Sequence, residues 1–271
     1  MKKTLITAAL AAITATAVSA EQRARFIAHR GESMTHPENT MAAFRAAIEG
    51  GADGLELDVY LTKDDGLILL HDKTTKRTTG VEIEPKDATV AELQALDAGS
   101  FKGAQFKGER MPTLAEALTL ARDGFEIYVE IKDVPLPKLH LVAEAVKAEP
   151  KATPARVLFH CFDQHKVTEL RKLLPEYRAY WLTDVRPEKD GKPAAPFDGR
   201  IKQAKSFNAS GLNLNANGHI TPEGVKAVKE AGLSMHAWTV NQTPYARELA
   251  GMGVESILSD RAVEMKKEMG N

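Results

Sequence analysis

The chain has 271 residues, with 36 basic and 37 acidic side chains and a formal net charge of −1 at pH 7. A charge this close to zero argues against a nucleic-acid partner, because proteins that bind nucleic acids usually carry a basic excess. Beyond residue 20 no apolar run is long enough to cross a bilayer, so stable membrane insertion is not expected. The single cysteine, Cys161, excludes an intramolecular disulfide, so the fold depends on its core.

Residues 1–20 have the pattern of a secretory signal peptide. Lys2 and Lys3 form a basic start, an apolar stretch follows, and Val-Ser-Ala ends the segment as a small-residue cleavage site. The apolar stretch is too short to span a bilayer comfortably. We therefore expect export, to the periplasm or out of the cell, with cleavage after Ala20. Residues 21–271 then form a single domain, because their number is near the size of one (β/α)8 barrel.

The first apolar run of the mature chain, residues 26–28, ends abruptly at His29. This pattern is typical of a short strand that delivers polar side chains at its C-terminal end. A helix is expected over residues 41–48, because the apolar residues there have helical spacing and two glycines follow. Either Asn39 or Thr40 is expected to cap this helix.

A second strand is expected over residues 54–59, and strand alternation places Glu56 and Asp58 on one face. Only about a dozen residues separate Asp58 from His71, which is too few for a helical crossover between parallel strands. Residues 67–70 are therefore expected to fold back as a hairpin. This return places His71 near the two carboxylates.

The rest of the chain begins with a polar excursion over residues 73–110, where Thr89 and Glu92 fit the capping box of a small helix. A regular alternation follows, and its first helix begins with a second capping box, Thr113 with Glu116. Further strands are expected at residues 125–132, 156–162, 178–182, 211–214, 234–240 and 255–258, and helices at 113–123, 136–148, 163–174, 201–206, 221–231 and 243–250. Without the hairpin this makes eight parallel strands, which predicts an α/β fold, a (β/α)8 barrel. A doubly wound open sheet is the main alternative, but no glycine-rich dinucleotide turn is present.

A third carboxylate, Glu130, shares a strand face with Lys132 in the segment 125–132. We expect it to join the other two at the C-terminal mouth, where barrels place their sites. Three carboxylates in one place need a cation, and an all-oxygen set favours Mg²⁺, Ca²⁺ or Mn²⁺ over zinc. The alternative for Glu130 is a structural ion pair with Lys132.

Six motifs, in order, resemble those of the glycerophosphodiester phosphodiesterase family. They are His29-Arg30-Gly31, Pro37-Glu38-Asn39-Thr40, Glu56-Leu57-Asp58, His71-Asp72, Glu130-Ile131-Lys132 and Trp238-Thr239-Val240-Asn241. The resemblance covers residues 25–260, essentially the whole mature chain. It implies a (β/α)8 barrel that carries a divalent cation, Ca²⁺ or Mg²⁺ with Mn²⁺ as a further candidate.

The resemblance also implies a role for each site residue. The implied metal ligands are Glu56, Asp58 and Glu130, and the implied general base and acid are His29 and His71. The implied substrate contacts are Arg30 and Lys132 on the phosphate, with Glu38, Asn39, Phe162 and Trp238 as further candidates. The two aromatic residues are expected either to contact the substrate or to fill the barrel core. Attack by the glycerol 2-hydroxyl and attack by water both remain open.

Two positions depart from the family pattern. Cys161-Phe162, preceded by His160, stands where Ser-Phe is common, and residues 259–261 read Ser-Asp-Arg in place of Thr-Asp and a proline. We expect neither departure to touch the metal or histidine groups. His160 is expected either to be a core histidine or to donate a hydrogen bond to a substrate hydroxyl or a carboxylate.

The leading hypothesis is an exported, metal-dependent phosphodiesterase that hydrolyses a small-molecule glycerophosphodiester to glycerol 3-phosphate and an alcohol. One alternative is a phospholipase-type phosphodiesterase that acts on intact lipid. The sparse aromatics and the lack of a basic amphipathic helix argue against it. The other alternative is a non-catalytic protein that binds phosphodiesters. The head group, the histidine that acts as the acid, and the oligomeric state stay open.

Overall fold

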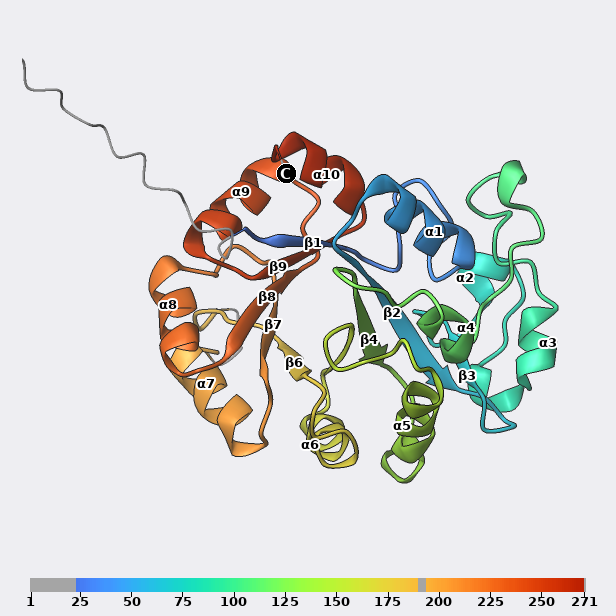
Figure 1. The fold of residues 1–271 in the computed structure, drawn as a ribbon, viewed down its shortest axis with the longest axis horizontal. Coiled ribbons are helices and arrows are strands. Elements are labelled where there is room, and N and C mark those ends of the chain that lie inside the picture. The colour runs from blue at the N-terminus through green and yellow to red at the C-terminus, as the bar shows by residue number, and fades with distance from the viewer. Residues whose placement is uncertain (1–22, 190–193, 271) are drawn as a thin grey trace, which may run out of the picture.

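The computed structural model describes residues 23–189 and 194–270, so the predicted signal peptide lies outside the described residues. The strands close into a barrel, because the first strand pairs with both the second and the last strand of the sheet. Figure 1 shows the strands at the centre of the molecule with the helices arranged around them. The predicted (β/α)8 barrel is confirmed.

All eight barrel strands run parallel. They are β1 (Arg25–Ala28), β2 (Gly54–Leu61), β4 (Glu126–Ile131), β5 (Val157–Cys161), β6 (Ala179–Thr183), β7 (Gly211–Asn215), β8 (Ser234–Trp238) and β9 (Ser256–Ser259). The remaining strand, β3 (Leu67–Leu69), pairs antiparallel with the end of β2, with Val59 opposite Leu69. The predicted hairpin is therefore confirmed, and it lies outside the barrel count.

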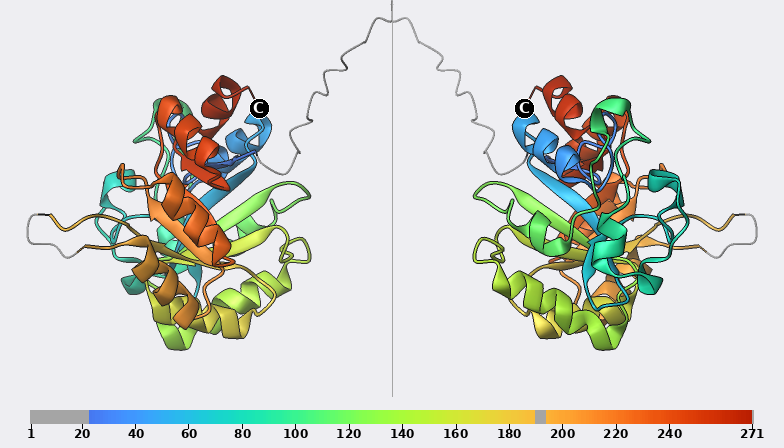
Figure 2. Two further views of the ribbon diagram at one scale, coloured as in Figure 1. Left: turned by 90° about the vertical axis from the view of Figure 1, so that its left-hand side faces the viewer. Right: turned by 90° about the vertical axis from the view of Figure 1, so that its right-hand side faces the viewer.

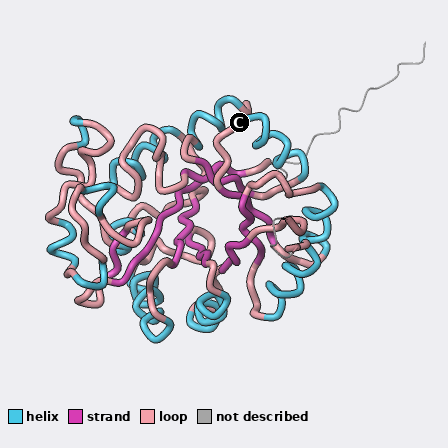
Figure 3. Tube along the Cα trace, turned by 180° about the vertical axis from the view of Figure 1, so that it is seen from behind, coloured by secondary structure: helices cyan, strands magenta, loops and turns pink. Residues whose placement is uncertain are grey.

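Helices form an outer layer around the strands, as the view from behind shows in Figure 3. They are α1 (Met41–Gly50), α2 (Lys76–Thr79), α3 (Val90–Gln94), α4 (Leu114–Leu118), α5 (Leu139–Ala148), α6 (Gln164–Leu173), α7 (Phe197–Ser206), α8 (Pro222–Glu230), α9 (Thr243–Met252) and α10 (Ala262–Glu268), with 3-10 turns η2 (Pro85–Asp87), η3 (Ala104–Phe106) and η4 (Leu136–Lys138). In the part of the chain that the structure describes, no helix combines the length and the apolar character needed to cross a membrane.

Local sequence signals account for where several helices begin. Thr89 and Thr113 each form a capping box, as their spacing to a glutamate three residues later predicts. The cap of α1 is Thr40, whose side chain accepts from the Ala43 backbone N–H, so Asn39 is not the cap. The helix predicted to reach residue 123 ends at Leu118, because the chain turns before β4. Helices α2 and α10 were not predicted.

The core has two main layers and one satellite. Inside the barrel a small cluster is built on Ile27, Tyr128, Leu158, Tyr180 and Leu258, all fully buried. A larger layer fills the space between the strands and the outer helices. Because side chains pack the barrel interior, it is not an open channel, and the substrate has to bind at one of its ends.

The satellite core lies under the excursion of residues 73–110. It is built around Tyr60, Ile68, Leu93 and Met111, which come from the β2–β3 hairpin and from the excursion itself. The excursion, with α2 and α3, covers this hairpin at one side of the barrel (Figures 1 and 2). It is thus a packed part of the domain that anchors the segment leading into His71.

Candidate active site

Polar side chains from most of the barrel strands meet in one cavity of about 190 Å³. It lies at the carboxyl ends of the strands, because its lining residues end or follow β1, β4, β5 and β8. Those lining residues are His29, Arg30, Glu56, His71, Glu130, Lys132, His160, Phe162, Leu182, Trp238, Thr239 and Leu258. The structure thus brings most of the predicted site residues together. Of the other three, Glu38 and Asp58 bind the lining side chains of Arg30 and Lys132, and Asn39 binds Asp58.

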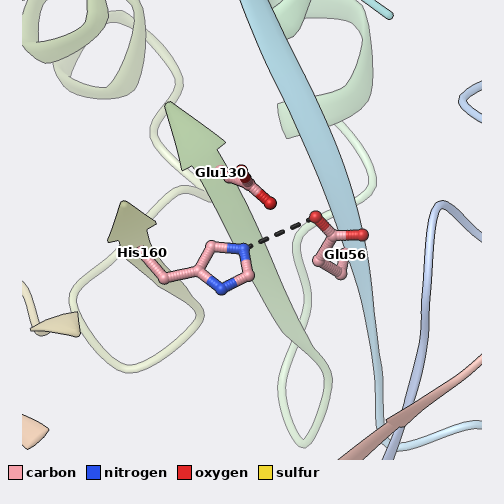
Figure 4. Close-up of side chains that lie close together, drawn as sticks. All are labelled: Glu56, Glu130 and His160. Carbon is pink, nitrogen blue, oxygen red and sulfur yellow. Dashed lines mark ion pairs between the residues drawn. The ribbon is translucent and has the colours of Figure 1, made fainter. Parts of the chain in front are cut away.

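At the base of the cavity Glu56, Glu130 and His160 form a compact cluster (Figure 4). One carboxylate oxygen of each glutamate and one ring nitrogen of His160 all lie within 4.8 Å of one another. Glu56 is fully buried, and its Oε2 accepts from the Arg30 backbone N–H at 2.9 Å. Its Oε1 has no hydrogen-bond partner among residues 23–189 and 194–270.

Asp58 lies beside this cluster and is already held by other groups. Its Oδ2 accepts from Asn39 Nδ2 at 2.8 Å, and its Oδ1 lies 3.2 Å from Lys132 Nζ. Asn39 also accepts from the Asp58 backbone N–H at 3.2 Å, so its amide holds this residue at two points. The structure therefore gives Asn39 a positioning role on Asp58, and the ligand role of Asp58 stays a prediction.

Two cationic side chains face the carboxylates. Lys132 Nζ lies 2.7 Å from Glu130 Oε1, and Arg30 Nε lies 3.6 Å from Asp58 Oδ2. The Glu130–Lys132 ion pair expected as the structural alternative does form, yet both residues line the cavity. Lys132 and Arg30 are therefore placed to meet an anion that enters the cavity.

The electrostatics of the cluster leave room for more positive charge. Burial, reinforced by the negative charge of Asp58, raises the pKa of Glu130 to about 7. For Glu56 burial acts in the same direction, but the imidazoles of His160 and His29 outweigh it and lower its pKa to about 2. An added divalent cation would offset the repulsion between the carboxylates, and the partnerless Glu56 Oε1 is a ready ligand atom. These residues therefore fit a divalent cation.

The two predicted catalytic histidines are oriented in the same way. His29 Nδ1 lies 2.7 Å from Asp260 Oδ1, and His71 Nδ1 lies 2.9 Å from Asp72 Oδ1. Despite the opposing effect of burial, the hydrogen bond from His29 lowers the pKa of Asp260 to about 2. Because an ionised carboxylate can only accept, Nδ1 of His29 carries a proton and donates it.

This orientation turns the second ring nitrogen of His29 towards the cavity. Its Nε2 lies 4.0 Å from Glu56 Oε2. Burial lowers the pKa of His29, but the hydrogen bond to Asp260 and the charge of Glu56 outweigh burial, so the pKa is raised. Asp260 is itself held by Asn241 Nδ2 at 2.6 Å and by Ser33 Oγ at 3.1 Å.

The expectation that neither departure touches the metal or histidine groups is wrong for His160. In the second segment the departing residues are Ser259 and Arg261, and Asp260, which matches the family pattern, binds the ring of His29 directly. His160 stands in the carboxylate cluster, and its ring nitrogen Nε2 lies 3.5 Å from Glu56 Oε1. Both contacts join segments far apart in the chain. Closeness of His160 to a carboxylate was one of its two expected roles, whereas the contact of Asp260 with His29 was not expected.

A guanidinium that the sequence reasoning missed links two parts of the site. Arg77, in α2, donates to both oxygens of Glu38 at 2.6 and 2.8 Å, and its Nε donates to Asp72 Oδ2 at 2.6 Å. Glu38 also accepts from Arg30 Nη1 at 3.1 Å. Arg77 thus connects Glu38, the partner of Arg30, with Asp72, the partner of His71. The only signal for it in the sequence was its closeness to His71 along the chain.

Two aromatic side chains form an apolar edge of the cavity. The rings of Phe162 and Trp238 pack edge to face, with centroids 5.6 Å apart. Phe162 is 52% exposed, so it does not fill the core. Trp238 is half-buried, and its Nε1 donates to the backbone carbonyl of Asn213 at 3.2 Å. Contact of the two rings with a substrate stays a prediction.

The barrel and this cavity define a class of protein, a (β/α)8-barrel enzyme that holds imidazoles, carboxylates and cationic side chains around one site. The chain belongs to the glycerophosphoryl diester phosphodiesterase family, whose sequence model matches residues 29–264. It is accordingly an enzyme of that class, a glycerophosphodiester phosphodiesterase.

Individual relatives agree with this assignment. The chain is 35% identical over 236 residues to a glycerophosphodiester phosphodiesterase of Caldanaerobacter subterraneus, across 86% of this chain and 93% of the relative. It is 33% identical over 254 residues to the Bacillus altitudinis enzyme of the same name, across 90% and 99%. Among solved structures, an Oleispira antarctica phosphodiesterase in complex with the product sn-glycerol-3-phosphate matches with a TM-score of 0.81 at 26% identity, over 92% of this chain and 98% of that one.

Replacing Arg77 by Ala should lower kcat for a glycerophosphodiester by about tenfold to a hundredfold, because small displacements of reacting groups have effects of this size. The fold should persist, since Arg77 is exposed and contributes no core packing. Arg77→Lys should recover only part of the loss, because an ammonium cannot contact Glu38 through two parallel hydrogen bonds.

Steady-state kinetics on purified variants measure this effect. Lys76→Ala is the matched control, because Lys76 is the exposed neighbour of Arg77 in α2. Equal activity of Arg77→Ala and Lys76→Ala would show that the link through α2 has no part in the reaction.

Proposed function

We propose that this protein hydrolyses glycerophosphodiesters to glycerol 3-phosphate and an alcohol, with one bound divalent cation and two histidines that transfer protons. The observation that carries the proposal is that His29, His71, Arg30 and Lys132 face the same cavity as the carboxylate cluster. The glycerol-3-phosphate bound to the Oleispira antarctica relative supports the choice of product.

Arg30 and Lys132 suit a phosphodiester. Such a substrate carries one negative charge, and its cleavage concentrates more charge on the nonbridging oxygens. Both cationic groups are partly screened from solvent and are held by neighbouring carboxylates, so they are positioned before substrate arrives. Preorganised charge of this kind stabilises a transition state more than mobile water does.

The proposed ligands of the divalent cation are Glu56, Asp58 and Glu130, and Ca²⁺ or Mg²⁺ is the expected ion for carboxylate oxygens, with Mn²⁺ next. When bound, the cation supplies positive charge to the nonbridging oxygens of the phosphate. The buried Glu56 Oε1 supports this assignment, because the described residues offer it no hydrogen bond.

The two imidazoles carry the proton transfers. The Nε2 of one takes a proton from the attacking hydroxyl, which belongs to water or to the glycerol 2-position of the substrate. The Nε2 of the other gives a proton to the oxygen of the departing alcohol as the bond from phosphorus to that oxygen breaks. Attack by the 2-hydroxyl gives a cyclic phosphate, which water then opens to glycerol 3-phosphate as the bond from phosphorus to the 2-oxygen breaks. Asp260 and Asp72 keep each ring turned with Nε2 towards the cavity.

The first test is the release of glycerol 3-phosphate, followed with a coupled enzyme assay, from choline, ethanolamine, glycerol and inositol diesters. Activity should be lost after EDTA treatment and restored by a divalent cation, because the carboxylate cluster then regains the charge that it lacks. A folded protein that binds these diesters without metal-dependent turnover would support the non-catalytic alternative. Turnover of intact phospholipid alone would support the phospholipase alternative.

A second test addresses the histidine pair. His29→Ala and His71→Ala should each lower kcat by about 10² to 10⁴, the usual contribution of one positioned acid or base. His165→Ala is the control, because His165 is exposed on α6. The wild-type profile of activity against pH should be bell-shaped, because one imidazole must be neutral and the other protonated. Nearly full activity of His71→Ala would refute its role.

The variant Asp260→Asn tests whether His29 is the base or the acid. The carboxylate of Asp260 raises the pKa of His29, so its loss lowers that pKa. The limb of the bell-shaped profile that belongs to His29 should therefore move to lower pH. Movement of the acidic limb identifies His29 as the base, and movement of the basic limb identifies it as the acid.

We also propose that the enzyme is exported, on the signal-peptide pattern of residues 1–20. Expression of the full chain in a bacterium followed by cell fractionation should place it in the periplasm or the medium. Mass spectrometry should then find Glu21 as the first residue. An intact chain that begins at Met1 and stays in the cytoplasm would contradict the proposal.

A further inference from the structure

His160 is a buried imidazole with one ring nitrogen aimed into the carboxylate cluster. It lies at the end of β5 and is only 1% exposed. Its Nε2 is 3.5 Å from Glu56 Oε1, and within residues 23–189 and 194–270 neither atom has a hydrogen-bond partner. A separation of 3.5 Å is long for a hydrogen bond between two such groups. Buried polar atoms are rarely left in this state, so the pair calls for a third group between them.

The separation suits two ligands of one ion. Two donor atoms in adjacent coordination positions, each about 2.0 to 2.2 Å from the ion, lie about 3.0 to 3.5 Å from each other. A carboxylate oxygen of Glu130 lies within 4.8 Å of both atoms, which is also within the reach of a shared ion. Figure 4 shows all three side chains pointing towards the same point from β2, β4 and β5.

The other ring nitrogen of His160 has the partner that a metal-binding histidine needs. The side-chain amide of Asn213, on β7, lies 3.0 Å from His160 Nδ1 and is fully buried. Asn213 Oδ1 has no hydrogen-bond partner among the described residues. If the Asn213 amide is flipped by 180°, its Oδ1 accepts a hydrogen bond from Nδ1 of His160. Nε2 of His160 then keeps its lone pair and points it into the carboxylate cluster. Metal-bound histidines usually donate their second N–H to an oxygen in this way.

We propose that His160 binds the divalent cation through Nε2, beside Glu56 and Glu130, and that the site therefore prefers a first-row transition ion such as Mn²⁺ to Ca²⁺ or Mg²⁺. Imidazole is a good ligand for transition ions, whereas Ca²⁺ and Mg²⁺ are bound almost entirely by oxygen. The inference rests on the proposed function only in placing a cation in this cavity. It replaces the ligand set of oxygen atoms alone with a set that also contains one imidazole nitrogen.

Calorimetric titration of the EDTA-treated protein with Mn²⁺, Ca²⁺ and Mg²⁺ tests the preference. Mn²⁺ should bind at least about tenfold more tightly than either of the other ions. In His160→Gln the Mn²⁺ affinity should fall by about tenfold to a hundredfold, while the Ca²⁺ affinity should change little, because Gln offers an oxygen. The control is His165→Gln, on the surface of α6, which should bind all three ions as the wild type does.

Pulsed electron paramagnetic resonance of the Mn²⁺-loaded protein tests the bond itself. The wild type should show hyperfine coupling to an imidazole nitrogen, which changes on ¹⁵N labelling of histidine and is absent in His160→Gln. If His160→Gln does not fold, the same measurements are made on variants of Asn213. Asn213→Asp should keep the coupling, because a carboxylate accepts the proton of Nδ1, and Asn213→Leu should weaken Mn²⁺ binding about tenfold or more.

Two outcomes separate this inference from the proposed function. A Mn²⁺-loaded wild type without nitrogen coupling, or a His160→Gln that keeps it, overturns the ligand role of His160, even if glycerol 3-phosphate is still released. A protein that shows the coupling but releases no glycerol 3-phosphate with any ion supports the ligand role and overturns the proposed function.

Discussion

The site depends on the burial of several carboxylates at one end of a closed barrel. Glu56 and Asp58 are fully buried and Glu130 nearly so, and ionised groups are costly to remove from water unless other charges compensate them. Arg30 and Lys132 supply part of this compensation through ion pairs of 3.6, 3.2 and 2.7 Å. What they leave uncompensated is negative charge at the barrel mouth, and this is why the cation and the phosphate are both proposed to bind there.

The register of neighbouring strands creates that concentration of charge. Asp58 pairs with Glu130 across β2 and β4, and Glu130 pairs with His160 across β4 and β5. In a parallel sheet, residues paired in this way lie at the same level, and alternation turns them to the same face. Three ionisable side chains on three adjacent strands therefore form one row at the mouth, although about 30 to 70 residues separate them along the chain.

Groups around this row fix the orientation of the two proposed catalytic imidazoles, those of His29 and His71. Nδ1 of His29 contacts Asp260, and Nδ1 of His71 contacts Asp72. Each of these carboxylates has a further partner, Asn241 for Asp260 and Arg77 for Asp72. Such supporting contacts limit the rotation of a side chain without touching a substrate. The excursion of residues 73–110 thus contributes to the site as well as covering the hairpin, because it supplies Arg77.

Features that depend on near neighbours in the chain could be predicted from the sequence. The two-residue alternation of strands put Glu56 with Asp58 and Glu130 with Lys132, the capping boxes located the starts of α3 and α4, and the short return to His71 allowed only a hairpin. The specific partners of Asp260 and His160, in segments far apart in the chain, could be found only from the folded structure. Asp260 reaches His29 across 231 positions, and His160 reaches Glu56 and Asn213 from other strands. Local spacing cannot encode these contacts, because they depend on how the closed barrel sets the register and level of strands that are remote along the chain.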